Sequence, residues 1–140
     1  MTRASEEPEQ TVLVVGGPVE ASVLRLDEPL SFWGGVDAAT GAIIDARHPQ
    51  RGETVAGRVV AMRRGRGSSS AAGVILELVR SGVAPAAFVL GEPDDIITLG
   101  AIVADELYDV ALPVIISAEA AAWSTGTLVR IDRDGLQPLD

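Results

Sequence analysis

The densest group of chemically capable side chains in this sequence is the segment 63–70, Arg-Arg-Gly-Arg-Gly-Ser-Ser-Ser. It follows a short apolar run, 58–62, and precedes residues with apolar side chains at helical spacing. The first turn of a helix presents unpaired N–H groups and a partial positive charge, which attract anions. Neighbouring arginines add full charges, and glycines let a ligand approach the backbone. The segment therefore has the residue types of a carboxylate or phosphate site.

The same segment also has a purely structural interpretation. Serine is among the best N-cap residues, so a capped helix behind a solvated basic loop explains the composition as well. In the functional interpretation, by contrast, the same N–H groups and arginines would also stabilise the alkoxide of a serine held there, as a general base requires. A P-loop is excluded because the chain has no lysine, and the G-x-S-x-G nucleophile elbow is absent. The residues alone leave both interpretations open.

Composition limits the classes of protein and of site. The chain has 140 residues, of which 47% are hydrophobic and 4% aromatic, so we expect one domain with an aliphatic core. A net charge of −9 argues against nucleic acid and anionic membranes as partners. The chain has no cysteine and a single histidine, His48, which argues against a metal cage on this chain. Without an apolar leader or a run of about 20 apolar residues, a soluble cytoplasmic protein is favoured.

Strand-like segments fill the first half of the chain, and helices alternate with strands in the second half. Apolar runs predict strands over 11–16, 20–27, 42–46, 58–62, 86–90, 114–117 and 126–132. Helices are expected from about Ser69 or Ser70 to just before Gly82, over 92–109, and briefly over 118–123. The order predicts an α/β fold with a mixed or barrel-like sheet and helices packed on it.

Two further expectations concern the second helix and the chain ends. Apolar residues at helical spacing indicate which face of the 92–109 helix packs on the core, namely Ile96, Leu99, Val103 and Leu107. Asp94 and Asp95 give this helix an acidic start that suits its dipole. A single domain over 11–132 is expected, with a disordered tail over 1–10 and a polar tail over 133–140.

The segment 63–70, followed by 73–90, closely resembles the small subunit of aconitase X enzymes, the separately encoded swivel domain of that branch of the aconitase superfamily. Residues 26–62, with the pattern SFWGGVD…TG.I.D..HP..G, and residues 91–116 carry the similarity further, so that it covers roughly 12–132. The resemblance implies a swivelling β/β/α domain that caps the active site of a larger subunit. It also implies hydro-lyase chemistry, in which water is removed from or added across a carbon–carbon bond.

The resemblance also implies roles for particular residues. In this superfamily the swivel domain supplies a serine from a G-x-G-S-S segment as the general base, and the matching residue here is Ser68. Substrate contacts are expected from the same segment and from the loop near 31–37: Arg66, Gly67, Ser69, Gly34, Gly35 and Asp37. Asp37 has an alternative role in a local Asx turn. Iron, as a cluster or a single ion, is implied in the large subunit and not on this chain.

Two dehydratases fit the resemblance. One acts on cis-3-hydroxy-L-proline and the other on phosphomevalonate, each through a heteromeric complex of this chain with a large subunit. Phosphate makes fuller use of the arginines, but a carboxylate uses them too. The arginine- and alanine-rich, lysine-free composition suggests a high-GC genome and favours the bacterial hydroxyproline enzyme. A non-catalytic interaction module on the same fold is a third possibility, and the intact segment 65–70 counts against it.

Overall fold

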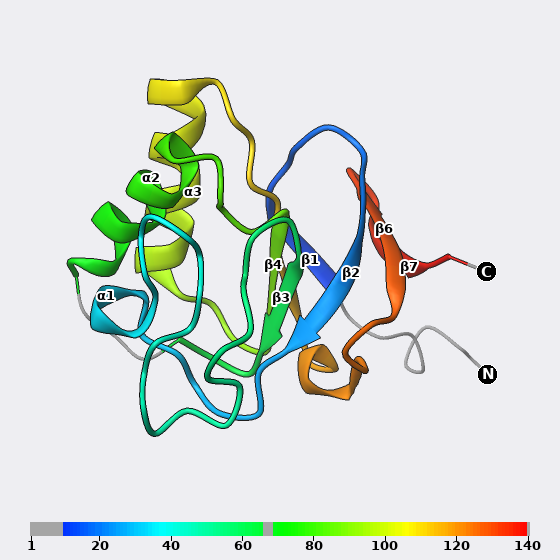
Figure 1. Ribbon diagram of the computed structural model, residues 1–140. Coiled ribbons are helices and arrows are strands. Elements are labelled where there is room, and N and C mark those ends of the chain that lie inside the picture. The colour runs from blue at the N-terminus through cyan, green and yellow to red at the C-terminus, as the bar shows by residue number, and fades with distance from the viewer. Residues whose placement is uncertain (1–9, 66–68, 140) are drawn as a thin grey trace.

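The computed structural model describes residues 10–65 and 69–139, which form one curved seven-stranded sheet with helices on its outer side (Figure 1). The strand order is β1-β5-β4-β3-β2-β6-β7. The strands are β1 (Gln10–Val14), β2 (Val19–Arg25), β3 (Val59–Met62), β4 (Ala87–Leu90), β5 (Val114–Ser117), β6 (Leu128–Asp132) and β7 (Gly135–Pro138). The helices are α1 (Phe32–Gly35), α2 (Ala71–Arg80), α3 (Asp95–Tyr108) and the 3-10 turn η2 (Ala120–Ala122).

The centre of the sheet is parallel. Strands β2, β3, β4 and β5 pair in parallel, with α2 and α3 as the crossovers from β3 to β4 and from β4 to β5. Every residue of β3 and β4 is buried, as expected for strands covered on both faces. Val60 and Phe88 pack in the core beneath the helices, whereas their neighbours Val59 and Ala87 pack in a second core with residues of β6.

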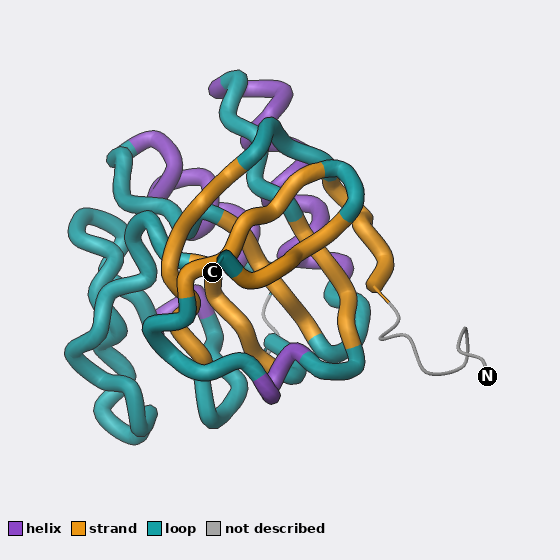
Figure 2. Tube along the Cα trace, turned by 90° about the vertical axis from the view of Figure 1, so that its right-hand side faces the viewer, coloured by secondary structure: helices purple, strands orange, loops and turns teal. Residues whose placement is uncertain are grey.

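The sheet curls until its two edge strands nearly meet. The side-chain amide of Gln10 on β1 donates to the Leu136 carbonyl of β7 at 3.2 Å and accepts from the Leu136 N–H at 2.9 Å. Gly135 has φ of +121° and lies directly against this amide, so a β-carbon there would collide with it. Figure 2, viewed from the β6 and β7 side, shows the strands curving round a common interior. The expected α/β fold with a barrel-like sheet is confirmed.

Two expectations about strands are wrong. Residues 42–46 form only isolated bridges, Val36 with Ile43 and Ala42 with Thr54, because the Asp45 side chain accepts from the Arg47 N–H at 3.0 Å and turns the chain. The segment 133–140, expected to be a polar tail, contains β7. That strand is paired on one side only, and it buries Gly135 and Leu136 while Gln137 and Pro138 are exposed. Its composition therefore resembles a tail.

Helix α3 is rotated from its expected orientation. Its buried residues are Ile97, Gly100, Ala101 and Ala104, whereas Leu99 is 50% exposed and Leu107 is 63% exposed. A β-carbon on Gly100 would lie 3.3 Å from the Ile75 side chain of α2, so small residues allow the two helices to approach closely. The rotation leaves large apolar side chains on the outer surface. Within the described residues, no helix has the length and apolar character needed to cross a membrane.

Candidate functional site

The carboxyl ends of the parallel strands meet at one edge of the sheet, which is the usual position for ligand sites in α/β folds. A cleft of about 390 Å³ lies at this edge. It is lined by residues that follow or end β2, β3 and β4: Arg25, Leu26, Asp27, Glu28, Pro29, Arg63, Arg64 and Glu92. Arg63 and Arg64, at the beginning of the segment 63–70, therefore lie on the wall of a cleft.

The loop that leaves β3 is packed tightly against the turn between β4 and α3. The Gly91 N–H donates to the carbonyls of Met62 at 3.0 Å and Arg63 at 2.9 Å. A β-carbon on Gly91 would lie 2.9 Å from the Arg63 carbonyl oxygen, and one on Gly65 would lie 2.6 Å from Oδ2 of Asp94. The contact at Gly91 is with backbone, so glycine is required there, whereas a side chain at position 65 would displace the Asp94 carboxylate.

Asp94 connects this loop to α3. As N-cap, its Oδ1 accepts from the N–H groups of Ile96 and Ile97, both at 3.0 Å, while its Oδ2 lies beside Gly65. The expected acidic start of this helix is confirmed. One carboxylate therefore satisfies two unpaired helix donors and also contacts the loop at the cleft.

We expect Asp94→Ala to lower the free energy of unfolding by about 1 kcal/mol, because two backbone N–H groups lose their acceptor. Asp94→Asn keeps an acceptor oxygen and should retain most of that stability. Asp95→Ala is the matched control, since this exposed residue lies in the same first turn and is not the N-cap. Denaturant unfolding of the three variants measures the effect, and equal losses for Asp94→Ala and Asp95→Ala would contradict the capping role.

The predicted site residues of the segment 63–70 lie only partly within the described structure. Arg66, Gly67 and Ser68 fall outside the described residues, so their roles stay predictions. Ser69 is exposed, and α2 begins directly after Ser70, close to the expected start. Helix α2 ends before Gly82, whose φ of +78° fits the expected helix stop.

The predicted loop residues Gly34, Gly35 and Asp37 are not among the residues that line this cleft. Gly34 has φ of +83° and kinks α1, and a β-carbon on Gly35 would lie 3.2 Å from the Leu30 side chain. Asp37 makes the Asx turn considered as its alternative, with Oδ1 accepting from the Ala39 N–H at 2.8 Å. The loop adjoins α2 through α1, and a substrate role for its residues stays a prediction.

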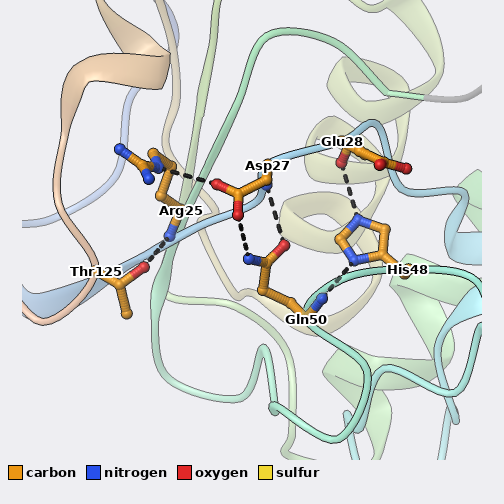
Figure 3. Close-up of polar contacts among 6 residues, drawn as sticks. All are labelled: Arg25, Asp27, Glu28, His48, Gln50 and Thr125. Atoms are coloured by element: carbon orange, nitrogen blue, oxygen red, sulfur yellow. Dashed lines mark hydrogen bonds and ion pairs between the residues drawn. The ribbon is translucent and has the colours of Figure 1, made fainter.

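The structure adds site residues that sequence reasoning missed (Figure 3). Gln50 donates from Nε2 to Oδ2 of Asp27 at 2.8 Å, and its Oε1 accepts from the Asp27 N–H at 3.0 Å. Arg25 Nε lies 3.3 Å from Oδ1 of Asp27, and the Arg25 N–H donates to Oγ1 of Thr125 at 3.0 Å. The hydrogen bond from Gln50, with a smaller contribution from the charge of Arg25, lowers the pKa of Asp27. Asp27 and Gln50 are 23 residues apart, and no local motif joins them.

His48 lies beneath this group and is only 5% exposed. Its Nδ1 accepts from the Gln50 N–H at 3.0 Å, and its Nε2 lies 2.9 Å from the Glu28 carbonyl oxygen. Because a backbone N–H can only donate, Nδ1 carries no hydrogen, and Nε2 donates to the carbonyl. Both ring nitrogens of the neutral imidazole are used, so His48 is a turn residue and has no nitrogen left for a metal ion or a substrate proton.

The donor set of the described residues does not fit an iron centre. No group of three or more histidine, aspartate or glutamate side chains gathers in 10–65 and 69–139 to hold a metal ion. The sequence contains no cysteine, and the contacts of His48 occupy its ring. The charged side chains that line the cleft in this part of the chain are arginines and carboxylates.

The chain thus combines a nearly closed α/β sheet with a cleft at the carboxyl edge of its parallel strands, where Arg63 and Arg64 follow β3. The chain belongs to the aconitase X swivel domain family, whose model matches residues 9–137. The resemblance inferred from 26–62, 63–90 and 91–116 is thereby confirmed.

Relatives with two different substrates are similar to this chain. A cis-3-hydroxy-L-proline dehydratase of Pseudomonas aeruginosa is 41% identical over 135 residues, covering 91% of this chain but only 23% of the relative. A phosphomevalonate dehydratase small subunit of Thermococcus gammatolerans is 39% identical over 121 residues, covering 86% of this chain and 88% of the relative. The crystal structure of Thermococcus kodakaraensis aconitase X in its holo-form matches with a TM-score of 0.83 and 34% identity, covering 95% of this chain and 98% of that chain.

Proposed function

We propose that this chain is the small, swivelling subunit of a hydro-lyase and acts with a large subunit to dehydrate cis-3-hydroxy-L-proline. The observation that carries the choice of substrate is the mixed charge of the cleft. Three arginines, Arg25, Arg63 and Arg64, share its lining with three carboxylates, Asp27, Glu28 and Glu92. Such a wall suits a ligand that itself carries both charges.

Hydroxyproline is such a ligand, with a carboxylate and a secondary ammonium group close together. The arginines attract the carboxylate, and the acidic side chains attract the ammonium group. Phosphomevalonate carries only negative groups, so the same three carboxylates would repel it. The Pseudomonas relative, which is named for hydroxyproline, supports this choice.

Dehydration removes a proton from the α-carbon and the hydroxyl from the neighbouring carbon. We assign the proton acceptor to Ser68, on the family's G-x-G-S-S segment. Its alkoxide takes the α-proton, the double bond forms between the two carbons, and the C–O bond breaks to release hydroxide. Return of the α-proton from the Ser68 hydroxyl to that hydroxide gives water and restores the alkoxide. A serine hydroxyl is ordinarily a very weak acid, so this role needs a cationic, N–H-rich surrounding. Arg63 and Arg64 on the cleft wall, with the start of α2 shortly after, support such a surrounding.

We assign the iron centre expected for the family to the large subunit, because the described residues of this chain have no donor set for it. The active enzyme then needs both subunits. The small-subunit relatives, of which this chain covers 88% in Thermococcus gammatolerans, support a separately encoded partner. The same relatives make phosphomevalonate the second candidate substrate, since a phosphate group would also bind Arg25, Arg63 and Arg64.

Comparison of the two substrates tests the proposal. The complex of this chain with its large subunit should dehydrate cis-3-hydroxy-L-proline with a kcat/KM at least about 10²-fold above that for phosphomevalonate, because the acidic wall rejects the phosphate. Substrate loss and formation of the unsaturated product are followed for each compound. A preference for phosphomevalonate would assign the chain to the second candidate, and turnover of neither would favour a non-catalytic module.

A further inference from the structure

We propose that Gln50, anchored by His48, is a positioning residue that fixes Asp27 and Arg25 on the cleft wall and thereby sets substrate affinity. The inference rests on the proposed function in one respect, namely that this cleft binds a charged substrate. It concerns three segments that are distant in sequence: the end of β2, the turn 45–52 and the loop that contains Thr125.

The first step is the two-point contact between Gln50 and Asp27. The Gln50 amide binds the backbone N–H and one carboxylate oxygen of Asp27, so that loop and side chain are held together. The second carboxylate oxygen is then directed to Nε of Arg25. The Asp27 side chain is 47% exposed, and without the amide an exposed carboxylate on a loop would sample other rotamers.

The second step is the anchor of Gln50 itself. His48 accepts the Gln50 N–H at Nδ1 and donates to the Glu28 carbonyl from Nε2. The turn and the cleft loop are therefore joined twice, between Gln50 and Asp27 and between His48 and Glu28. We call these two contacts the junction. Because the imidazole is buried, neither of its hydrogen bonds can be replaced readily by water. One ring thus holds both sides of the junction.

The third step connects this junction to the ligand. Arg25, Asp27 and Glu28 all line the cleft, together with the arginines that follow β3. His48 and Gln50 are not among the lining residues, so they act through their neighbours. Hydrogen bonds that only stabilised the fold would not need to hold charged side chains of the cleft lining, as those of Gln50 hold Asp27. Loss of the junction should therefore weaken binding more than it slows the chemical step.

Steady-state kinetics of the two-subunit complex tests this split. Gln50→Ala should raise KM about tenfold while kcat changes less than about threefold, since a hydrogen bond to a charged group is worth about one order of magnitude in affinity. Arg51→Ala is the matched control, because Arg51 is exposed on the same turn and lies outside the network and the cleft lining. An unchanged KM in a folded Gln50→Ala complex would overturn the proposal, and so would equal effects of Gln50→Ala and Arg51→Ala.

Conservative substitutions at His48 separate the two hydrogen bonds. In His48→Asn the side-chain oxygen takes the place of Nδ1 and can accept the Gln50 N–H, whereas in His48→Gln the amide can still donate to Glu28. His48→Asn should keep KM closer to wild type than His48→Ala does, because it preserves the anchor of Gln50. Failure of His48→Asn to rescue KM relative to His48→Ala would count against the anchor.

A spectroscopic measurement tests the junction independently of turnover. His48 is the single histidine of the chain, so its two ring ¹⁵N signals are unambiguous in the full-length protein. We expect the Nε2–H tautomer, and an Nδ1–H tautomer would overturn the proposed anchor.

If the wild-type complex turns over phosphomevalonate and not hydroxyproline, the proposed substrate fails. The effect of Gln50→Ala on KM and kcat is then measured with phosphomevalonate. If the complex turns over neither compound, the junction is tested by the His48 tautomer and by the pKa of Asp27 in the wild-type chain and in Gln50→Ala. An equal Asp27 pKa in the two proteins would overturn the junction.

Discussion

Replacing Ser68 with alanine is expected to reduce single-turnover dehydration by the two-subunit complex by about 10²–10⁴-fold, the range attributed to general acid–base catalysis. The substitution removes the proposed proton acceptor. It leaves in place Arg63, Arg64 and the start of α2 at Ala71, so substrate binding should largely survive. The free energy of unfolding, measured by thermal unfolding, should fall by no more than the loss of a helix N-cap costs, on the order of 1 kcal/mol.

Ser70→Ala is the matched control for this experiment. It makes the same substitution in the same segment, at the residue that precedes α2. A modest effect is expected on both rate and stability, because this serine is not assigned to the chemical step. If Ser68→Ala retains near-normal turnover, the base is another residue, and the segment 63–70 is a helix start with a basic loop.

The purified chain alone is expected to show no dehydratase activity and no iron, and addition of the large subunit should restore both. The reason is the small share of the catalytic machinery that this chain can hold. It matches only 23% of the length of the Pseudomonas relative, and its described residues have no donor set for a metal ion. Activity assays and metal analysis of each subunit and of their mixture measure the effect.

The Ser68→Ala chain provides a control for assembly. It should bind the large subunit as tightly as the wild-type chain and yield an iron-containing but nearly inactive complex. Turnover by the single chain would contradict the division of roles between subunits. So would failure of the two wild-type subunits to co-purify, because the proposed active site then could not form.

Local signals allowed the sequence to predict much of the fold. Gly82 marked the end of α2, and Asp94 marked the start of α3, because helix ends depend on backbone conformation and on unpaired N–H groups within a single turn. Continuous apolar runs identified β3 and β4 as strands, and the structure buries every residue of both. These features involve neighbours in the chain, so their physical cause is visible in the sequence.

The candidate site was predicted in part for the same reason. The segment 63–70 combines its charges, glycines and hydroxyls within eight positions, and the structure places Arg63 and Arg64 on the wall of a cleft. The rest of the cleft lining was missed. Asp27 lines the cleft and Gln50 holds it from 23 residues away, and neither residue has a local pattern that distinguishes it from a surface side chain.

The sequence by itself determined the family, the α/β class and the end of α2 before Gly82, because each rests on contiguous residues and short-range hydrogen bonds. Only the tertiary structure decided which face of α3 is buried, since close approach to Ile75 selects Gly100 and excludes Leu99. It also decided the closure of the sheet by Gln10 across 126 residues and the contact of Arg25 with Thr125 across 100 residues. Such contacts follow from the order of strands in the sheet, and strand order depends on how every element packs at once.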